Sequence, residues 1–271
     1  MPAEFYRAPP TYSNIQEAVK WLKSQYTNFK AFPIGKSVQG RDIMAFCLGN
    51  PAGSTVYLGG VRGYEWFTGT VLLRFYRDLI RAVGHGGCVS DIDVKNALAD
   101  RPVTIIPCLN PDGAELSLKG ADTVTGTNAG GVDLYRNFDA GHKKIPAGEF
   151  GGGHPGSEPE TAALVSFCLH YRPRNLYSLH LPGEAVHFHY GKNTPVRSRM
   201  IGRILASSAG YALARPDSQN LHGSPAAWFI EKNRKPGFVI EIGRADTLPG
   251  LAGLDRTYLR IEEMLMLAAL L

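Results

Sequence analysis

The most constraining feature of the sequence is a short apolar run that ends in two glycines and passes into a helical pattern. Residues 55–58 have the composition of a buried strand, and Gly59 and Gly60 end it. Apolar residues then recur at helical spacing over residues 66–83. Strand, glycine turn and helix begin a βαβ unit, and α/β sheets bind ligands at such turns. Because a carboxylate, Glu65, lies in this turn, we interpret it as a candidate site.

Strand and helix patterns alternate along the rest of the chain. Apolar strand patterns are present at residues 32–37, 41–48, 54–59, 102–109, 175–180, 185–190 and 237–243. Helical patterns are present at residues 13–29, 66–83, 157–170, 195–209, 225–232 and 256–271. This alternation predicts an α/β fold with a mixed, mostly parallel sheet between helical layers. The length and the absence of linkers favour a single domain over residues 1–271.

Two local patterns give specific predictions about where elements begin and end. Ser13 and Gln16 have the spacing of a capping box, which predicts that Ser13 caps the first helix. The Asn-Pro-Asp-Gly stretch at 110–113 follows a predicted strand and has the residues of a tight turn. We therefore expect the chain to turn sharply there.

Composition excludes several classes of function. The net charge is +5 and the pI is about 9.0, but the basic residues are dispersed and no aromatic-interleaved basic stripe is present, so we expect no nucleic-acid partner. The first 12 residues have no signal-peptide pattern and no apolar run is long enough to span a membrane, so we expect a cytoplasmic protein without a membrane partner. The four cysteines are far apart, which favours free thiols over disulfides.

Three ionisable residues lie at the edge of, or within, apolar strands: Glu65, His180 and Glu241. Each has an ordinary structural explanation. Glu65 could cap the following helix, His180 could be a satisfied residue at a strand end, and Glu241 could pair with Arg136 or Arg244. Ionisable groups in apolar surroundings cluster at functional sites, however, and the three together favour a site.

Eight stretches of the chain, in order, resemble the zinc metallocarboxypeptidases of the carboxypeptidase A type, and most closely the bacterial γ-D-glutamyl-meso-diaminopimelate peptidases. The stretches are 34–41, 59–66, 110–113, 131–138, 157–161, 178–180, 228–232 and 236–243. The resemblance implies a single carboxypeptidase-like α/β domain, with a twisted sheet of about eight strands and helices on both faces.

The resemblance also implies a catalytic chemistry. The family holds zinc with a His-x-x-Glu pair and a distal His, and Glu65 and His180 match the second and third of these ligands. Glu241 matches the carboxylate general base. Arg136 matches the Arg of an Asn-Arg pair that binds the substrate carboxylate. The implied cofactor is zinc, and the implied partner is a small peptide of the kind derived from peptidoglycan, a muropeptide.

The chain departs from the family pattern at the chemistry itself. Arg62 occupies the position of the first zinc-ligand His, and a guanidinium has no lone pair to give a metal. Tyr135 stands where the substrate-binding Asn is expected. Further family residues are missing: an Arg near Gly126, a Tyr around Gln219, and the polar residues at 226–227, where two alanines stand.

Two hypotheses follow from these departures. The first is a zinc peptidase that acts on peptidoglycan-derived peptides, with His187, His189 or His222, or water, completing the ligand set. The second is a catalytically inactive homologue that keeps the cleft as a peptide- or carboxylate-binding module. In the second, Arg62 pairs with Glu65 and supplies the positive charge in place of zinc.

Overall fold

The structure is a computed structural model that describes residues 4–27, 29–120, 125–142, 145, 151–214, 219–244 and 250–271. Its helices are α1 (Tyr12–Gln25), α2 (Trp66–His85), α3 (Val94–Ala97), α4 (Pro111–Ser117), α5 (Pro159–Tyr171), α6 (Arg197–Ala209), α7 (Pro225–Asn233) and α8 (Leu254–Leu270). Its strands are β1 (Lys30–Lys36), β2 (Asp42–Leu48), β3 (Thr55–Leu58), β4 (Cys88–Val89), β5 (Ile92–Asp93), β6 (Val103–Ile106), β7 (Asn175–His180), β8 (Ala185–His187), β9 (Ala212–Leu213) and β10 (Gly237–Glu241).

Eight of the strands form one mixed sheet in the order β1-β2-β6-β3-β7-β10-β8-β9. The four central strands β6, β3, β7 and β10 are parallel to one another, whereas β1, β2 and β8 add antiparallel pairs. The predicted α/β fold with a mixed, mostly parallel sheet is confirmed. In the sheet, β3 lies between β6 and β7, so the chain continues from β3 to a neighbour on one side and later adds a neighbour on the other side. The carboxyl end of β3 is therefore the switch point at which α/β sheets bind ligands.

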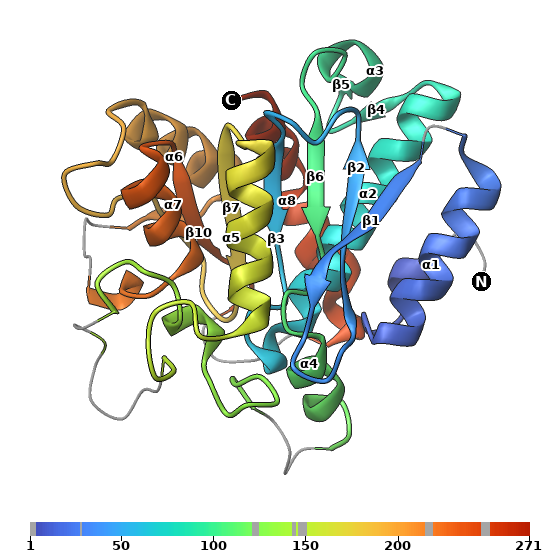
Figure 1. The fold of residues 1–271 in the computed structure, drawn as a ribbon. Coiled ribbons are helices and arrows are strands. Elements are labelled where there is room, and N and C mark those ends of the chain that lie inside the picture. The colour runs from blue at the N-terminus through green and yellow to red at the C-terminus, as the bar shows by residue number, and fades with distance from the viewer. Residues whose placement is uncertain are drawn as a thin grey trace.

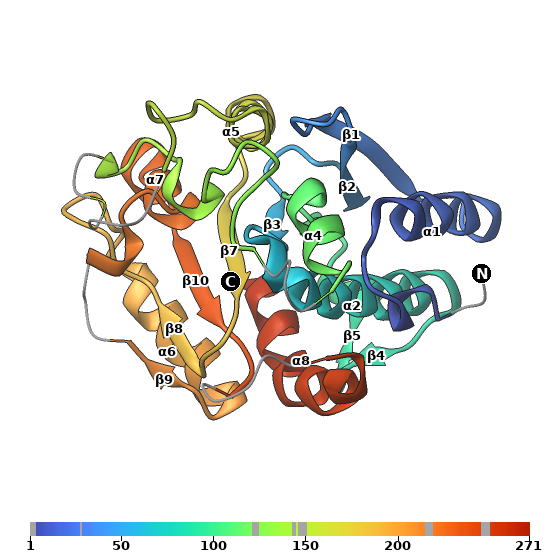
Figure 2. The same ribbon diagram turned by 90° about the horizontal axis from the view of Figure 1, so that it is seen from below.

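Helices cover both faces of the sheet (Figures 1 and 2). On one face, α5 and α7 pack on the strands; on the other lie α2, α6 and α8, with α1 at the far end. Two apolar cores result, one on each face, and both contain fully buried aromatic rings such as Tyr57 and Phe229. Burying both faces explains why the central strands are continuous apolar runs without alternation.

Two local predictions are wrong. Helix α1 is capped by Thr11, whose hydroxyl accepts the Asn14 N–H, so it begins before Ser13. The Asn-Pro-Asp-Gly stretch does not form a free turn, because it begins α4: Asn110 accepts the Gly113 N–H. Asn, Pro, Asp and Gly are favoured both in tight turns and at helix N-termini. Only the residues that follow decide which of the two structures forms.

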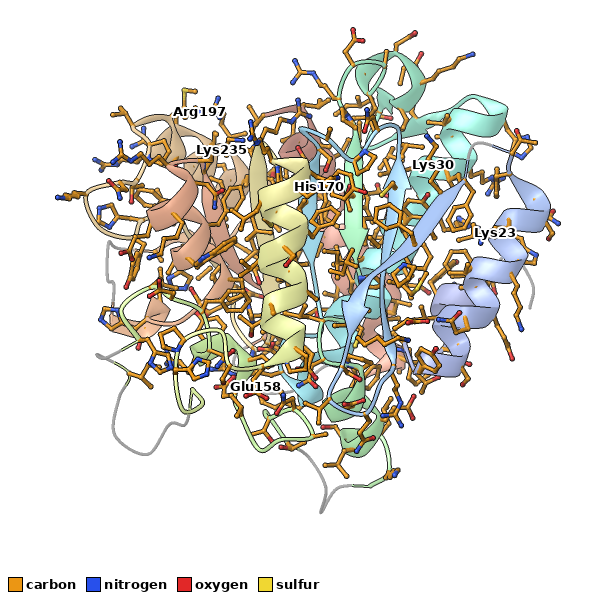
Figure 3. All side chains as sticks on the ribbon, viewed as in Figure 1. Lys23, Lys30, Glu158, His170, Arg197 and Lys235 are labelled. Atoms are coloured by element: carbon orange, nitrogen blue, oxygen red, sulfur yellow. The ribbon has the colours of Figure 1, made fainter. Side chains whose placement is uncertain are left out.

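The surface carries dispersed charge. Basic side chains such as Lys23, Lys30, Arg197 and Lys235 lie on different elements (Figure 3). Three cysteines are buried and Cys88 is exposed, and all four are free thiols, as predicted. In the part of the chain that the structure describes, no helix is both long and apolar enough to cross a membrane.

Candidate functional site

The candidate site lies at the carboxyl edge of the central strands, where β3, β7 and β10 end. After β3, the chain forms the short 3₁₀ helix η2 (Gly63–Glu65), which leads directly into α2. The Thr68 hydroxyl fixes this turn, because it accepts the Gly60 N–H at 2.8 Å and donates to the Glu65 carbonyl at 2.8 Å. Gly63 has to be glycine, since a β-carbon there would lie 2.5 Å from the Gly113 carbonyl oxygen of α4.

Glu65 and His180 meet although they are 115 residues apart in the chain. His180 Nδ1 lies 3.0 Å from Glu65 Oε2 and 3.2 Å from Oε1. The carboxylate also accepts the backbone N–H groups of Arg62 at 3.2 Å and Leu181 at 3.3 Å. Both side chains are buried. The pair matches two positions of the predicted metal site, with His180 Nδ1 facing the carboxylate.

The surroundings keep Glu65 ionised. Burial alone raises the pKa of a carboxyl group, but the charge and hydrogen bond of His180, the charge of Arg62 and the Leu181 N–H outweigh it. The pKa of Glu65 is therefore lower than its ordinary value of 4.5. A buried anion at this position requires a nearby cation, and Arg62 is one.

Ser178, His180 and Glu65 are connected like a Ser-His-acid triad, because the Ser178 hydroxyl lies 2.7 Å from His180 Nε2. Ser178 is fully buried, however, and is not among the residues that line the cavity next to His180. No substrate carbonyl could reach its oxygen, so we assign it no nucleophilic role. Its hydroxyl instead fixes the orientation of the His180 ring through the hydrogen bond at Nε2. The sequence analysis did not identify this role.

Arg62 is held by Asp133, a residue that the sequence analysis did not single out. Its Nη2 donates to Asp133 Oδ2 at 2.9 Å and its Nε donates to the same oxygen at 3.1 Å. Its Nη1 lies 4.0 Å from Glu65 Oε1, and its guanidinium carbon lies 4.4 Å from the centre of the Tyr135 ring. Burial lowers the pKa of a guanidinium, but Asp133 and Glu65 outweigh burial and raise the pKa of Arg62. The cation is thus permanent and lies among two carboxylates and an aromatic face.

The predicted substrate-binding residues Tyr135 and Arg136 lie in the short 3₁₀ helix η4 (Leu134–Arg136). Two cations lie close to the Tyr135 ring: the guanidinium carbon of Arg62 is 4.4 Å and that of Arg136 is 5.1 Å from the ring centre. Arg136 Nη1 donates to the backbone carbonyls of Asn220 at 3.0 Å and His222 at 2.9 Å. These two bonds position the Arg136 guanidinium at the edge of the site.

Glu241 lies at the end of β10, where its backbone pairs in register with His180 of β7. Its Oε2 is 3.4 Å from His187 Nε2, and its side chain is 36% exposed. Glu241 is therefore the accessible carboxylate of the site, whereas Glu65 is buried. An accessible carboxylate can accept hydrogen bonds from a ligand or act on a water molecule.

A cavity of about 160 Å³, which we call the cleft, joins these groups. It is lined by Arg62, Tyr135, Arg136, His180, Leu181, His187, Asn220, Leu221, Val239 and Glu241. The predicted catalytic and substrate-binding residues, together with His180 and Arg62, thus line one space. Their roles stay predictions. Asn220 was not predicted, because its position depends on a loop that the sequence does not define.

The residues present do not fit the zinc centre that the sequence resemblance implies. A catalytic zinc takes three protein ligands and keeps one open position, and Arg62 cannot be one of them. Of the suggested substitutes, only His187 lines the cleft; His189 lines another cavity and His222 Nδ1 is 2.9 Å from the Tyr190 hydroxyl. Within the described ranges, no group of three or more His, Cys, Asp or Glu side chains is placed to hold a metal.

Comparisons with known proteins agree with the fold and with the sequence resemblance. The family described as "Zinc carboxypeptidase" matches residues 15–232. Gamma-D-glutamyl-L-diamino acid endopeptidase 1 of Lysinibacillus sphaericus is 23% identical over 277 residues, covering 91% of this chain and 69% of the relative. Murein peptide amidase A of Escherichia coli (strain K12) is 30% identical over 143 residues, covering 48% of this chain and 53% of the relative. The structure of thrombin activatable fibrinolysis inhibitor superposes with a TM-score of 0.84 at 17% identity, covering 99% and 76% of the two chains.

Proposed function

The chain belongs to the zinc carboxypeptidase family, and we propose that its cleft binds the carboxylate end of a small peptide without zinc, with Arg62 supplying the positive charge. One observation carries this proposal: the Arg62 guanidinium is fixed on Asp133 beside Glu65, at the position of the missing zinc ligand. The guanidinium has no lone pair to give a metal, and its fixed positive charge repels a dication placed beside it.

The charges around the cleft favour a peptide over a simple anion. Arg136 lines the cleft with a guanidinium, the group that forms charge-assisted hydrogen bonds with carboxylates. Glu241 contributes a negative charge to the same space and suits an ammonium or amide N–H of the ligand. A ligand that carries both a carboxylate and an amino group therefore satisfies both sides. The cleft of about 160 Å³ has room for one terminal residue.

We propose a peptidoglycan-derived peptide that ends in a diamino acid as this ligand. The names of two relatives support the choice, because one is an endopeptidase for a γ-D-glutamyl-L-diamino acid bond and the other is a murein peptide amidase. A diamino acid places a carboxylate and a side-chain ammonium on one residue. These two groups match Arg136 and Glu241.

A zinc-dependent peptidase that cleaves such peptides is the second candidate. The observation that favours it is the close approach of His180 Nδ1 to Glu65 Oε2, at 3.0 Å, with Glu241 lining the same cleft. Three of the residues that the family chemistry requires are thus kept close together. The missing third ligand counts against this candidate.

Zinc content and ligand binding separate the two candidates. We would purify the protein with zinc present, quantify the bound metal, and titrate L-Ala-γ-D-Glu-meso-diaminopimelate by calorimetry with and without a chelator. We expect substoichiometric zinc, binding that the chelator does not change, and no cleavage of the peptide. Arg136→Gln should weaken binding about tenfold or more, because a charge-assisted contact is lost. Arg197→Gln, the same change on the exposed start of α6, should leave binding unchanged.

The opposite results would support the peptidase. Tight stoichiometric zinc in the unaltered protein, or release of diaminopimelate that the chelator abolishes, would refute binding without zinc. If the tripeptide does not bind in either condition, the choice of ligand is wrong.

A further inference from the structure

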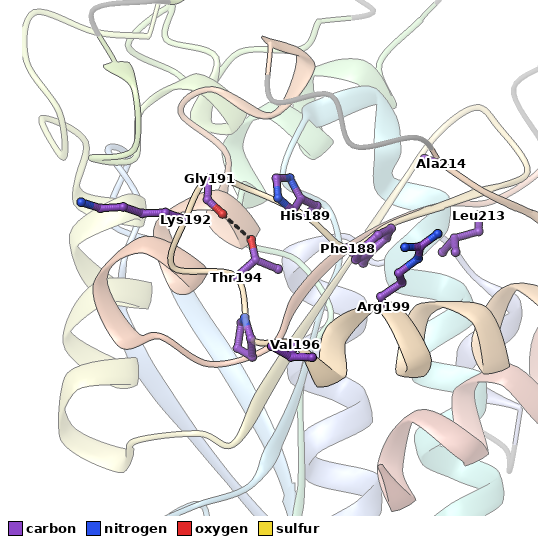
Figure 4. A pocket seen from close by; sticks show the side chains of 10 residues that line it. Phe188, His189, Gly191, Lys192, Thr194, Val196, Arg199, Leu213 and Ala214 are labelled. Carbon is purple, nitrogen blue, oxygen red and sulfur yellow. Dashed lines mark hydrogen bonds between the residues drawn. The ribbon is translucent and has the colours of Figure 1, made fainter.

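A second cavity, which we call the β8–α6 cavity, lies apart from the cleft between the segment that follows β8 and the start of α6. It has a volume of about 500 Å³, within the range of small-molecule sites. Its walls include Phe188, His189, Thr194, Val196, Arg199 and Leu213 (Figure 4). None of these residues lines the cleft. The cavity therefore needs an explanation that is independent of the proposed function.

Packing of α6 against the sheet edge shapes this cavity. Gly202 allows the close approach, because a β-carbon there would lie 3.0 Å from Leu213 Cδ1 and 3.2 Å from Phe188 Cβ. On the other side, the Thr194 hydroxyl accepts the Tyr190 N–H at 2.9 Å and donates to the Gly191 carbonyl at 3.0 Å. Both walls are thus held by the fold, and the space between them is preformed.

The surface of this cavity is apolar and positively charged. Figure 4 shows the Arg199 guanidinium beside Phe188 and Leu213, while Lys192 points its amine outward from the rim. Neither Arg199 nor Lys192 has an ion-pair partner among the residues that the structure describes. No Asp or Glu is among the lining residues, and α6 carries three arginines and no acidic residue. The acidic residue Glu231 lines an adjoining cavity together with Lys192.

Two further groups lack the partners that their surroundings call for. Val196 is 97% exposed at the mouth of the cavity, an apolar side chain left in water. His189 Nδ1 is buried and has no hydrogen-bond partner in the described structure. A ligand with an apolar body would cover Val196 and lie against the residues that line the cavity, His189 among them.

We propose that the β8–α6 cavity is a binding site for a small carboxylate with a flat apolar body. The apolar part lies against Phe188, Leu213 and Val196, and the carboxylate pairs with the Arg199 guanidinium. Lys192 adds a positive field at the rim, which attracts the anion without contacting it.

Cinnamate and its neutral counterpart cinnamyl alcohol test this site, because they share the apolar body and differ in charge. Binding to the full chain would be measured by calorimetry, together with the NMR shifts of the His189 ring. We expect cinnamate to bind and to shift the His189 signals. Arg199→Gln should weaken cinnamate binding about tenfold and leave cinnamyl alcohol unchanged. Arg203→Gln is the matched control, since Arg203 is an exposed arginine of the same helix that does not line the cavity.

Three outcomes would overturn the proposal. One is no cinnamate binding at millimolar concentration. Another is equal weakening by Arg199→Gln and Arg203→Gln, which would indicate unspecific attraction to a basic helix. The third is loss of cinnamate binding in Arg136→Gln, which would place the ligand in the cleft. The tripeptide titration of that variant is read separately, so failure of this site and failure of the proposed function can be told apart.

Discussion

The pairing of Arg62 with Asp133 predicts a measurable coupling between the two residues. We would replace Arg62 by Met and Asp133 by Asn, singly and together. Met keeps much of the apolar stem of Arg62 and removes its charge. Asn keeps the Oδ1 atom of residue 133, which accepts the Tyr135 N–H at 3.0 Å, so the start of η4 stays capped.

The magnitude follows from burial and contacts. The two side chains are 19% and 16% exposed and share contacts of 2.9 and 3.1 Å. Breaking a buried ion pair by removing one partner costs about 3–5 kcal/mol, and the remaining exposure places Arg62→Met near the lower end, at roughly 3 kcal/mol. Asp133→Asn should cost roughly 2 kcal/mol, because Arg62 then keeps Glu65 nearby. The double variant should lose roughly 3 kcal/mol instead of 5, a coupling of roughly 2 kcal/mol.

Urea denaturation followed by tryptophan fluorescence would measure the four unfolding free energies, with unchanged m-values as the check for two-state behaviour. Arg62→Met should also lower the melting temperature by roughly 6–12 °C, at about 2–4 °C per kcal/mol for a chain of this size. If the two single effects simply add within about 0.5 kcal/mol, the residues are not coupled and the guanidinium does not replace a metal charge.

Arg62→His extends the same measurement to zinc. A histidine there would complete the family's ligand set with Glu65 and His180. We expect this variant to be less stable than the unaltered protein without metal, and to gain about 2.7 kcal/mol when zinc is present at a hundredfold excess over its dissociation constant. The unaltered protein should gain nothing. An equal gain in both would show that Arg62 does not exclude the metal.

Two further predictions concern pH and thiol reactivity. The pKa of Glu65 is lower in the folded protein than its ordinary value of 4.5. The ionised Glu65 therefore stabilises the fold above about pH 4.5, and this stabilisation is lost as the pH falls through the pKa of the folded state. Between about pH 5 and 3, the Glu65→Gln variant should lose less stability than the unaltered protein, because it has no carboxylate to protonate. Denaturation at several pH values measures this, and parallel curves would refute it. Burial raises the pKa of Cys47 to about 11 and those of Cys108 and Cys168 to about 12, so at about pH 8 a thiol reagent should label only Cys88 rapidly. Labelling of several thiols in the folded protein would contradict the structure.

The sequence predicted the fold well because the central strands are long apolar runs with clear ends. The predicted strand 175–180 coincides with β7, and the strand and helix around Glu65 are where the pattern placed them. It failed where one set of residues suits two structures. The stretch 110–113 is the example: Asp112 accepts from the Ser37 hydroxyl and the Gln39 N–H, contacts across more than 70 residues that hold it at the start of α4.

The candidate site was predicted in part for a similar reason. Glu65, His180 and Glu241 were recognisable because each lies within an apolar strand, at its end, or in the turn that follows it. Asp133 was not, because an acidic residue in a loop is ordinary and its partner Arg62 is 71 residues away. One signal was available: Asp133 lies in the polar stretch 131–138, three residues before Arg136.

Asp133 and Arg62 also determine how this cleft depends on its environment. A metal can be removed by a chelator, exchanged for another metal, or be in short supply, and the charge of a metal-dependent cleft changes with it. The guanidinium of Arg62 is part of the chain, and its raised pKa keeps it charged. The positive charge of Arg62 is therefore in place from the moment the chain folds, whatever the supply of metal around it.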